Sequence, residues 1–165
     1  MSDPYVIGID PSLSETGIAT PYDTYTVPTK AGDEDRLHRI YDAVRIAPTP
    51  LDEGGCALAV IEDLPTHAKA AGLTGMAQGV VRLALWNSDV PYVTIPPATL
   101  KKFATGRGTA TKADMRLELY KRAGLDLRND NEVDAVWLRQ IGLHLLNHPD
   151  AMPLPKSHTD ALAKV

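Results

Sequence analysis

The stretch Tyr5-Val6-Ile7-Gly8-Ile9-Asp10-Pro11 decides the fold of this chain. Residues 5–9 are hydrophobic apart from one glycine, and such a run predicts a strand buried inside a sheet. The strand ends at Asp10-Pro11, because proline cannot donate the backbone hydrogen bond that a sheet needs. A carboxylate therefore stands at the end of a buried strand.

A second apolar stretch repeats this arrangement. Residues 56–61 form a short, almost wholly apolar run that ends at Glu62-Asp63, and we expect a second buried strand here. If the two strands are parallel neighbours about 4.8 Å apart, Asp10 and Glu62 lie at one edge of the sheet and can share a metal ion. One acid after a strand commonly just begins a loop, but two acids after the two most apolar strands favour a shared site.

Composition and spacing predict three further strands and five helices. The strands are expected at 17–20, 22–27 and 91–95, and the helices at 33–46, 70–88, 97–104, 112–123 and 130–147. Three early strands followed by alternating helices and strands imply a mixed sheet covered by helices. We expect one domain over 1–148. Because residues 149–165 contain three prolines and little periodicity, we expect a mobile tail there.

A third candidate acid lies at the start of the last predicted helix, in Asn129-Asp130-Asn131-Glu132-Val133-Asp134. Asp134 is followed by four apolar residues, and an acid in an apolar helix needs a partner or a metal. Asn131 is three residues away and shares the face of Asp134, so its amide oxygen is a candidate further ligand. Glu132 points about 200° away and fits a capping role with Asn129.

Asp10, Glu62 and Asp134 together indicate a specific chemistry. Oxygen ligands suit Mg²⁺, which keeps waters and binds phosphates. Two such ions about 3.5–4 Å apart can activate water and stabilise the leaving oxygen of a phosphodiester. We therefore expect a metal-dependent nuclease with these three acids as metal ligands.

Composition bounds the other possibilities. The 165 residues carry a net charge of −4 and one cysteine, Cys56, which excludes an internal disulfide. The acidic balance weighs against nucleic-acid binding. From Lys101 to Arg122, however, seven basic residues stand against two acids, and such a segment can contact a phosphate backbone.

No apolar run reaches the roughly 20 residues that span a bilayer, and we find no secretory signal. We expect a cytoplasmic protein with no membrane partner.

Two smaller patterns leave alternatives open. Gly72, Gly75 and Gly79 in one predicted helix cost stability unless something packs closely there, either the protein's own sheet or a second subunit. His144 and His148 are four residues apart and could bind a metal, but we expect them on a solvated helix face.

Six stretches, in order over residues 5–145, resemble the RuvC family of Holliday-junction resolvases. They are Val6-Ile7-Gly8-Ile9-Asp10-Pro11 with Thr16-Gly17, Ala59-Val60-Ile61-Glu62, Met76-Ala77-Gln78-Gly79-Val80, Leu100-Lys101-Lys102, Gly106-Arg107-Gly108-Thr109-Ala110-Thr111-Lys112, and Asn131-Glu132-Val133-Asp134-Ala135.

The resemblance implies a ribonuclease H-like α/β fold, with a mixed five-stranded sheet of three antiparallel early strands and two parallel ones, flanked by helices. It implies a homodimer that resolves Holliday junctions or other branched DNA with two Mg²⁺ ions per active site, for which Mn²⁺ substitutes. A phage-type member would act in the cytoplasm of its bacterial host.

The resemblance also assigns residues. Asp10, Glu62 and Asp134 match metal ligands, and Lys101 and Lys112 match functional lysines near the DNA backbone or the scissile phosphate. Lys112 is therefore a catalytic candidate. Together with the local charge, the DNA-binding candidates are Lys101, Lys102, Arg107, Lys112 and Arg116.

Two positions depart from the family pattern. Asn131 stands where many relatives have a fourth acid; its amide can still bind a metal, but it lowers the charge of the site. The stretch Asp63-Leu64-Pro65-Thr66 lacks the aromatic residue that better-studied relatives insert at the junction. Forks, flaps and RNA-containing duplexes therefore stay open as substrates.

Two alternatives come from other classes of protein. Actin-like ATPases and sugar kinases also begin with a Gly-Ile-Asp strand, but they need two such lobes, and this chain has room for one. The second alternative is a non-catalytic protein that binds branched DNA. The three acids disfavour it, because carboxylates repel phosphate unless a metal intervenes.

Overall fold

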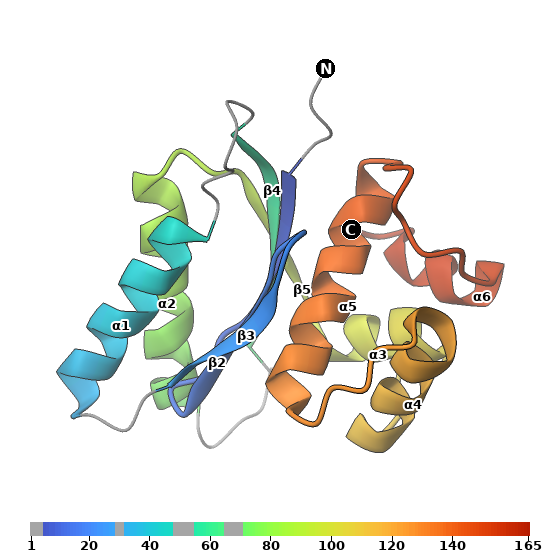
Figure 1. Ribbon diagram of the computed structural model, residues 1–165, viewed down its shortest axis with the longest axis horizontal. Helices are drawn as coiled ribbons and strands as arrows, with labels where there is room; N and C mark the ends of the chain where they lie inside the picture. Colours follow the sequence, from blue (N-terminus) through green and yellow to red (C-terminus); the bar gives the residue numbers. More distant parts are fainter. Residues whose placement is uncertain (1–4, 29–31, 48–54, 65–70) are drawn as a thin grey trace.

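A mixed five-stranded sheet forms the centre of the fold in the computed structural model (Figure 1). The structure describes residues 5–28, 32–47, 55–64 and 71–165. The strands, in chain order, are β1 (Tyr5–Asp10), β2 (Glu15–Ala19), β3 (Thr24–Pro28), β4 (Cys56–Glu62) and β5 (Tyr92–Ile95). Each strand expected from the sequence is present, with its ends shifted by at most two residues.

The strands lie side by side in the order β3-β2-β1-β4-β5. β1, β2 and β3 pair antiparallel, whereas β4 runs parallel to both β1 and β5. Ile9 is paired with Ile61, so the residues that follow them, Asp10 and Glu62, leave the sheet at the same edge. The expected combination of three antiparallel early strands and two parallel ones is confirmed.

Helices cover both faces of the sheet (Figure 1). On one face lie α1 (Asp33–Ile46) and α2 (Ala71–Asn87), and on the other α3 (Pro97–Thr105), α4 (Lys112–Ala123) and α5 (Asp130–Leu145). Residue 70, the expected start of the second helix, and residues 65–66 lie outside the described residues. No helix in the described part of the chain is both long and apolar enough to cross a membrane.

Strand parity decides which side chains meet α5. Tyr5, Ile7 and Ile9 belong to the core under α1 and α2. Because neighbouring residues of a strand point to opposite faces, Gly8 and Asp10 face α5. The same alternation in β4 puts Ile61 in the core under α1 and α2, and turns Glu62 toward α5.

Two glycines let α5 lie directly on the sheet. A Cβ atom on Gly8 would stand 2.0 Å from the carbonyl oxygen of Ala135, and one on Gly17 would stand 2.2 Å from that of Asn131. Both obstacles are backbone atoms, so no side-chain rotation could make room. The helix therefore rests backbone against backbone on β1 and β2, on either side of Asp134.

The chain after Pro149 differs from the mobile tail that we expect from the sequence. It forms a short helix, α6 (Lys156–Thr159), and a 3-10 turn, η1 (Asp160–Leu162), and it buries Met152 and His158. The backbone N–H of Met152 donates to Gln140 in α5 at 2.8 Å, and His158 Nδ1 lies 2.8 Å from the carbonyl oxygen of Phe103 in α3. The prolines break the periodicity of this segment, but separate anchors hold it in place.

This segment also explains why the expected solvated face at His144 and His148 is wrong. His148 is buried, and the ring of His144 packs edge-on against Phe103, with ring centroids 5.2 Å apart. His144 Nε2 lies 2.9 Å from the carbonyl oxygen of Met152. The C-terminal segment thus covers the end of α5 that we expect from the sequence to be exposed to solvent.

Candidate metal centre

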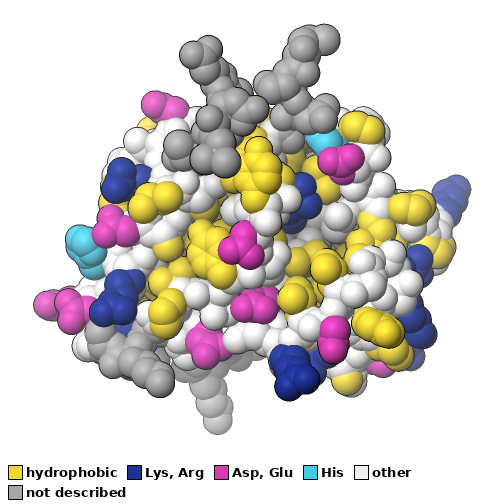
Figure 2. Space-filling model, in the orientation of Figure 1, with side chains coloured by type: hydrophobic (Ala, Val, Ile, Leu, Met, Phe, Trp, Pro, Cys, Tyr) yellow, Lys and Arg dark blue, Asp and Glu magenta, His cyan; other side chains and the backbone are white. Residues whose placement is uncertain are grey.

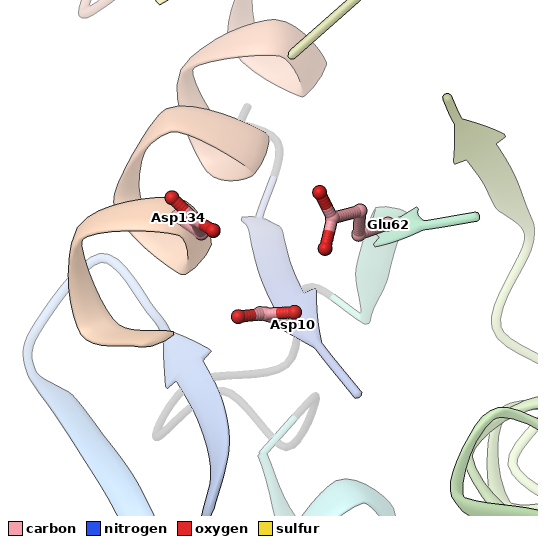
Figure 3. A group of neighbouring side chains, drawn as sticks. All are labelled: Asp10, Glu62 and Asp134. Carbon is pink, nitrogen blue, oxygen red and sulfur yellow. The ribbon is translucent and has the colours of Figure 1, made fainter. Parts of the chain in front are cut away.

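The three predicted acids meet at one edge of the sheet. Asp10 ends β1, Glu62 ends β4, and Asp134 comes from the second turn of α5; the three side chains point toward one another (Figure 3). One carboxylate oxygen from each residue lies within 4.8 Å of the other two. The spacing suits a group of ligands around a shared cation.

Burial and mutual repulsion disfavour the charged forms of these acids. Asp10 is 5% exposed and Asp134 is fully buried. Burial, followed by the charges of Glu62 and Asp134, raises the pKa of Asp10 well above its usual value. Burial also raises the pKa of Glu62 and of Asp134, and the charge of Asp134 adds to the effect on Glu62. Such a cluster costs stability unless a cation compensates for it.

One atom of the cluster has no partner at all within the described structure. Asp134 Oδ1 is buried and makes no hydrogen bond, a condition that native proteins rarely leave uncompensated. All three side chains offer oxygen ligands, as hard cations such as Mg²⁺ require, and the group contains no thiol or imidazole of the kind that zinc prefers. The donor set therefore fits a divalent hard cation.

Lysines bring positive charge to the three carboxylates. Lys112 stands at the start of α4, and its Nζ donates a hydrogen bond to Asp134 Oδ2. Burial lowers the pKa of Lys112, but the charges of the carboxylates outweigh it and raise the pKa overall. Lys101 in α3 opposes the burial that raises the pKa of Glu62 and Asp134. Two of the predicted basic residues thus lie beside the acids.

The other predicted DNA-binding residues lie on or between the same helices. Lys102 is exposed on α3, and Arg107, between α3 and α4, lies 3.6 Å from Asp114. Arg116 donates one hydrogen bond to Asp130 at 2.6 Å and one to the carbonyl oxygen of Arg128 at 2.8 Å. Arg116 therefore also ties α4 to the start of α5.

The structure confirms Asn129 as the residue that caps α5, but the expected capping box between Asn129 and Glu132 is wrong. Asn129 caps the helix by accepting a hydrogen bond from the backbone N–H of Asn131 at 2.9 Å. Glu132 turns to another side, where burial and then the charges of Asp23 and Glu15 raise its pKa. Asn131 lies with its backbone against Gly17, and the role of its amide as a metal ligand stays a prediction.

Two positioning residues lie in stretches that resemble the RuvC family, but the sequence analysis gives them no role. Gln78 in α2 is buried and donates hydrogen bonds to the carbonyl oxygen of Glu62 at 3.1 Å and to Asp63 Oδ1 at 3.2 Å. Thr16 is also buried, and its hydroxyl donates to the carbonyl oxygen of Ser12 at 2.7 Å, which fixes the turn after Asp10. A polar residue inside an otherwise apolar helix or strand is the one signal that could have pointed to them.

The sheet order, the helices on both faces and the three carboxylates at one edge define a ribonuclease H-like protein. Solved structures agree with this class. The fold is similar to that of Thermus thermophilus RuvC, with a TM-score of 0.69 and 21% identity over 91% of this chain and 99% of that one. It is equally similar to a structure of T. thermophilus RuvC in complex with a Holliday junction substrate, with a TM-score of 0.69 and 22% identity over 82% of this chain and 90% of that one.

Sequence relatives narrow the class to one family, although no family model matches the chain. The chain is 30% identical to the crossover junction endodeoxyribonuclease RuvC of Nocardia farcinica over 132 residues, which cover 73% of this chain and 69% of the relative. It is 28% identical to RuvC of Carboxydothermus hydrogenoformans over 83% of this chain and 94% of that one. The chain belongs to the RuvC family of crossover junction endodeoxyribonucleases.

Proposed function

We propose that this protein is a metal-dependent DNA endonuclease that resolves Holliday junctions or other branched DNA. The observation that carries the proposal is the group formed by Asp10, Glu62 and Asp134, in which Oδ1 of Asp134 is buried and has no hydrogen-bond partner among the described residues. Membership of the RuvC family supports the substrate class, since its members are named for cutting crossover junctions.

The three carboxylates would hold two Mg²⁺ ions, for which Mn²⁺ substitutes, with Asn131 as a further ligand. Ions bound in this way supply activation of a water and stabilisation of the leaving oxygen of a phosphodiester. The protein's own part is to hold the acids in place: Gln78 fixes the end of β4, and Gly8 lets α5 bring Asp134 onto the sheet.

The basic residues of α3 and α4 would bind the DNA backbone. Lys112 and Lys101 lie at the acids, where they would meet the phosphate that is cut. Lys102, Arg107 and Arg116 extend the positive charge away from the acids along the strand. Contacts of this kind set affinity and register without reading the sequence.

Cleavage of branched DNA by single variants tests the assignment of the acids. Asp10→Asn, Glu62→Gln and Asp134→Asn should each abolish cutting in Mg²⁺, because each removes a charged ligand while leaving the side chain's size unchanged. DNA binding should survive, as the lysines remain. Substantial cutting by all three variants would refute the proposal, and binding of branched DNA without any metal-dependent cutting by the wild type would favour a non-catalytic binding protein.

The preferred substrate is a separate question. Cutting rates on four-way, three-way, flap, fork and RNA–DNA hybrid substrates, in Mg²⁺ and in Mn²⁺, distinguish a junction resolvase from the alternative. A strong preference for the intact four-way junction would exclude a nuclease that acts mainly on forks, flaps or RNA-containing duplexes.

The exposed side of α2 supports a homodimer. A Cβ atom placed on Gly72 or Gly79 would meet no heavy atom of the described residues within 4 Å, so these glycines do not pack on the protein's own sheet. Met76, Leu83 and Trp86 lie on the same side and are 44%, 52% and 77% exposed. This spacing of three and four residues forms one stripe along a helix, as in helix pairs.

Light scattering with a matched pair of variants tests this dimer. Trp86→Asp should shift the protein toward the monomer, because it places a charge in an apolar contact, whereas Tyr22→Asp on the β2–β3 turn should not. A wild-type protein that is monomeric at micromolar concentration would contradict the dimer. Two further expectations remain proposals: a nuclease domain over 1–148 followed by a proline-containing C-terminal tail over 149–165, and a cytoplasmic location.

A further inference from the structure

One row of side chains on α4 runs outward from the carboxylates. Lys112, Arg116 and Tyr120 follow one another at intervals of four residues, so they lie along one side of the helix, about 6 Å apart at each step. Lys112 contacts Asp134 at the inner end of the row. Tyr120 therefore stands about 12 Å from Lys112 along the helix, a span of roughly three nucleotides in a duplex strand.

The outer end of this row is apolar and uncovered. Tyr120 is 56% exposed and Leu117 is 50% exposed, whereas Met115 and Leu119 on the opposite side of α4 are fully buried and hold the helix on the core. The backbone of Tyr120 ends the helix regularly, since its carbonyl oxygen accepts a hydrogen bond from Gly124 at 2.8 Å. The exposed ring is thus carried on a rigid, well-anchored helix.

The surroundings of this ring favour a polyanion. Lys121 lies beside Leu117 on the next turn, and its ammonium is 3.5 Å from Glu118. The side chain of Arg116 stays 39% exposed although it binds Asp130. Figure 2 shows Lys and Arg side chains beside hydrophobic ones over α4, at the lower right. Aromatic rings set among basic side chains are the usual means of binding single-stranded nucleic acid.

We propose that Tyr120 stacks on an unpaired base of the DNA strand that Lys112 and Arg116 lead into the site, and that it thereby favours branched over continuous duplex DNA. The proposal rests on the proposed function. A continuous duplex offers no free base face, because its bases stack on one another, and unstacking one costs several kcal/mol in general. At a branch point the continuous stack is interrupted, so unpairing a base and exposing its face costs less than in a continuous duplex, and the ring contributes mainly to binding there.

Binding measurements on matched DNAs test this role. In an Asp10→Asn background, which prevents cutting, Tyr120→Ala should bind branched DNA about 5- to 150-fold more weakly, the range expected when one base–aromatic stack is lost. Its affinity for unbranched duplex of the same length should change less than about twofold, because the phosphate contacts remain. Tyr120→Phe, which keeps the ring, should restore the preference for branched DNA.

Ile46→Ala is the control. Ile46 is 59% exposed at the end of α1, which lies on the other face of the sheet from α4 (Figure 1), so its removal should leave both affinities unchanged. A branched DNA with 5-iodouracil at the branch point should crosslink on irradiation to Tyr120, and the crosslink should disappear in Tyr120→Ala.

Three outcomes would overturn the proposal: an unchanged ratio of branched to duplex affinity in Tyr120→Ala, a loss in Tyr120→Phe equal to that in Tyr120→Ala, or a change of oligomeric state in Tyr120→Ala that accounts for the weaker binding. None of them depends on cleavage. The proposed function fails separately, if the chain with an intact Asp10 does not cut DNA in Mg²⁺ or Mn²⁺.

Discussion

Replacing Gly8 with alanine tests the idea that direct backbone contact places the third acid. The new Cβ would lie 2.0 Å from the carbonyl oxygen of Ala135 and 2.4 Å from the backbone nitrogen of Arg139. Non-bonded atoms pack at about 3.5–4.0 Å, so α5 must move away from β1 by about 1 Å or more. No rotamer change can avoid this movement, since both atoms belong to the helix backbone.

Two effects of Gly8→Ala follow, with different sizes. Forcing extra volume into a packed contact costs about 1–3 kcal/mol of the free energy of unfolding. Asp134 precedes Ala135 and moves with it, so the distance from Asp134 to Asp10 and Glu62 grows. A misplacement of about 1 Å typically costs on the order of 100-fold in rate, and we expect a loss of cutting of that order in protein that is still folded.

Urea unfolding and cleavage of a four-way junction in Mg²⁺ measure the two effects on the same preparation. Gly32→Ala is the control, because a Cβ at Gly32 meets no atom within 4 Å in the part of the chain that the structure describes; it should change cutting little. If Gly8→Ala unfolds within about 0.5 kcal/mol of the wild type and cuts at the wild-type rate, the helix does not depend on this contact and the reasoning is wrong.

Three further predictions concern charge, metal and the C-terminal segment. Burial, with Glu62 and Asp134, raises the pKa of Asp10, so the folded protein binds more protons than the unfolded one. The free energy of unfolding of the metal-free protein should therefore fall as pH rises from the ordinary pKa of a carboxyl group through the raised pKa of Asp10. Thermal melts across pH should show a smaller fall for Asp10→Asn, which has no carboxyl group to titrate at this position. Mg²⁺ at about 100 times its Kd should stabilise the wild type by about 2.7 kcal/mol; calorimetry should show this gain reversed by chelation and absent in Asp134→Asn. His158→Ala removes the contact with Phe103 and should cost about 1–3 kcal/mol in urea unfolding; an unchanged midpoint would mean that the C-terminal segment does not brace α3.

The three acids could be predicted from the sequence because each follows from a local rule. Asp10 and Glu62 stand where apolar runs stop, and parallel strands of similar length bring their ends to one edge. Asp134 is singled out by helix phase, which separates it from Glu132 without knowledge of the fold. These rules act over a few residues, so they can be applied before any tertiary structure is known.

What could not be predicted depends on contacts between distant elements. Gly8 and Gly17 look like ordinary strand glycines until α5 is known to lie on that face of the sheet. Gln78 reaches from α2 to the backbone of β4, and no spacing of residues along the chain predicts that contact. His158 anchors a segment whose irregular backbone has no period to detect. In each case the partner is set by topology rather than by sequence distance.

The origin of the three acids in β1, β4 and α5 also sets the order in which the site can be completed. Asp134 is synthesised 124 residues after Asp10, a delay of about 6 to 25 s at common rates of translation. A nascent chain that ends before α5 can pair β1 with β4, but it holds only two of the three ligands. Under the proposed function, an unfinished or truncated chain is harmless to DNA, because the helix that completes the group of metal ligands is synthesised after every strand of the sheet.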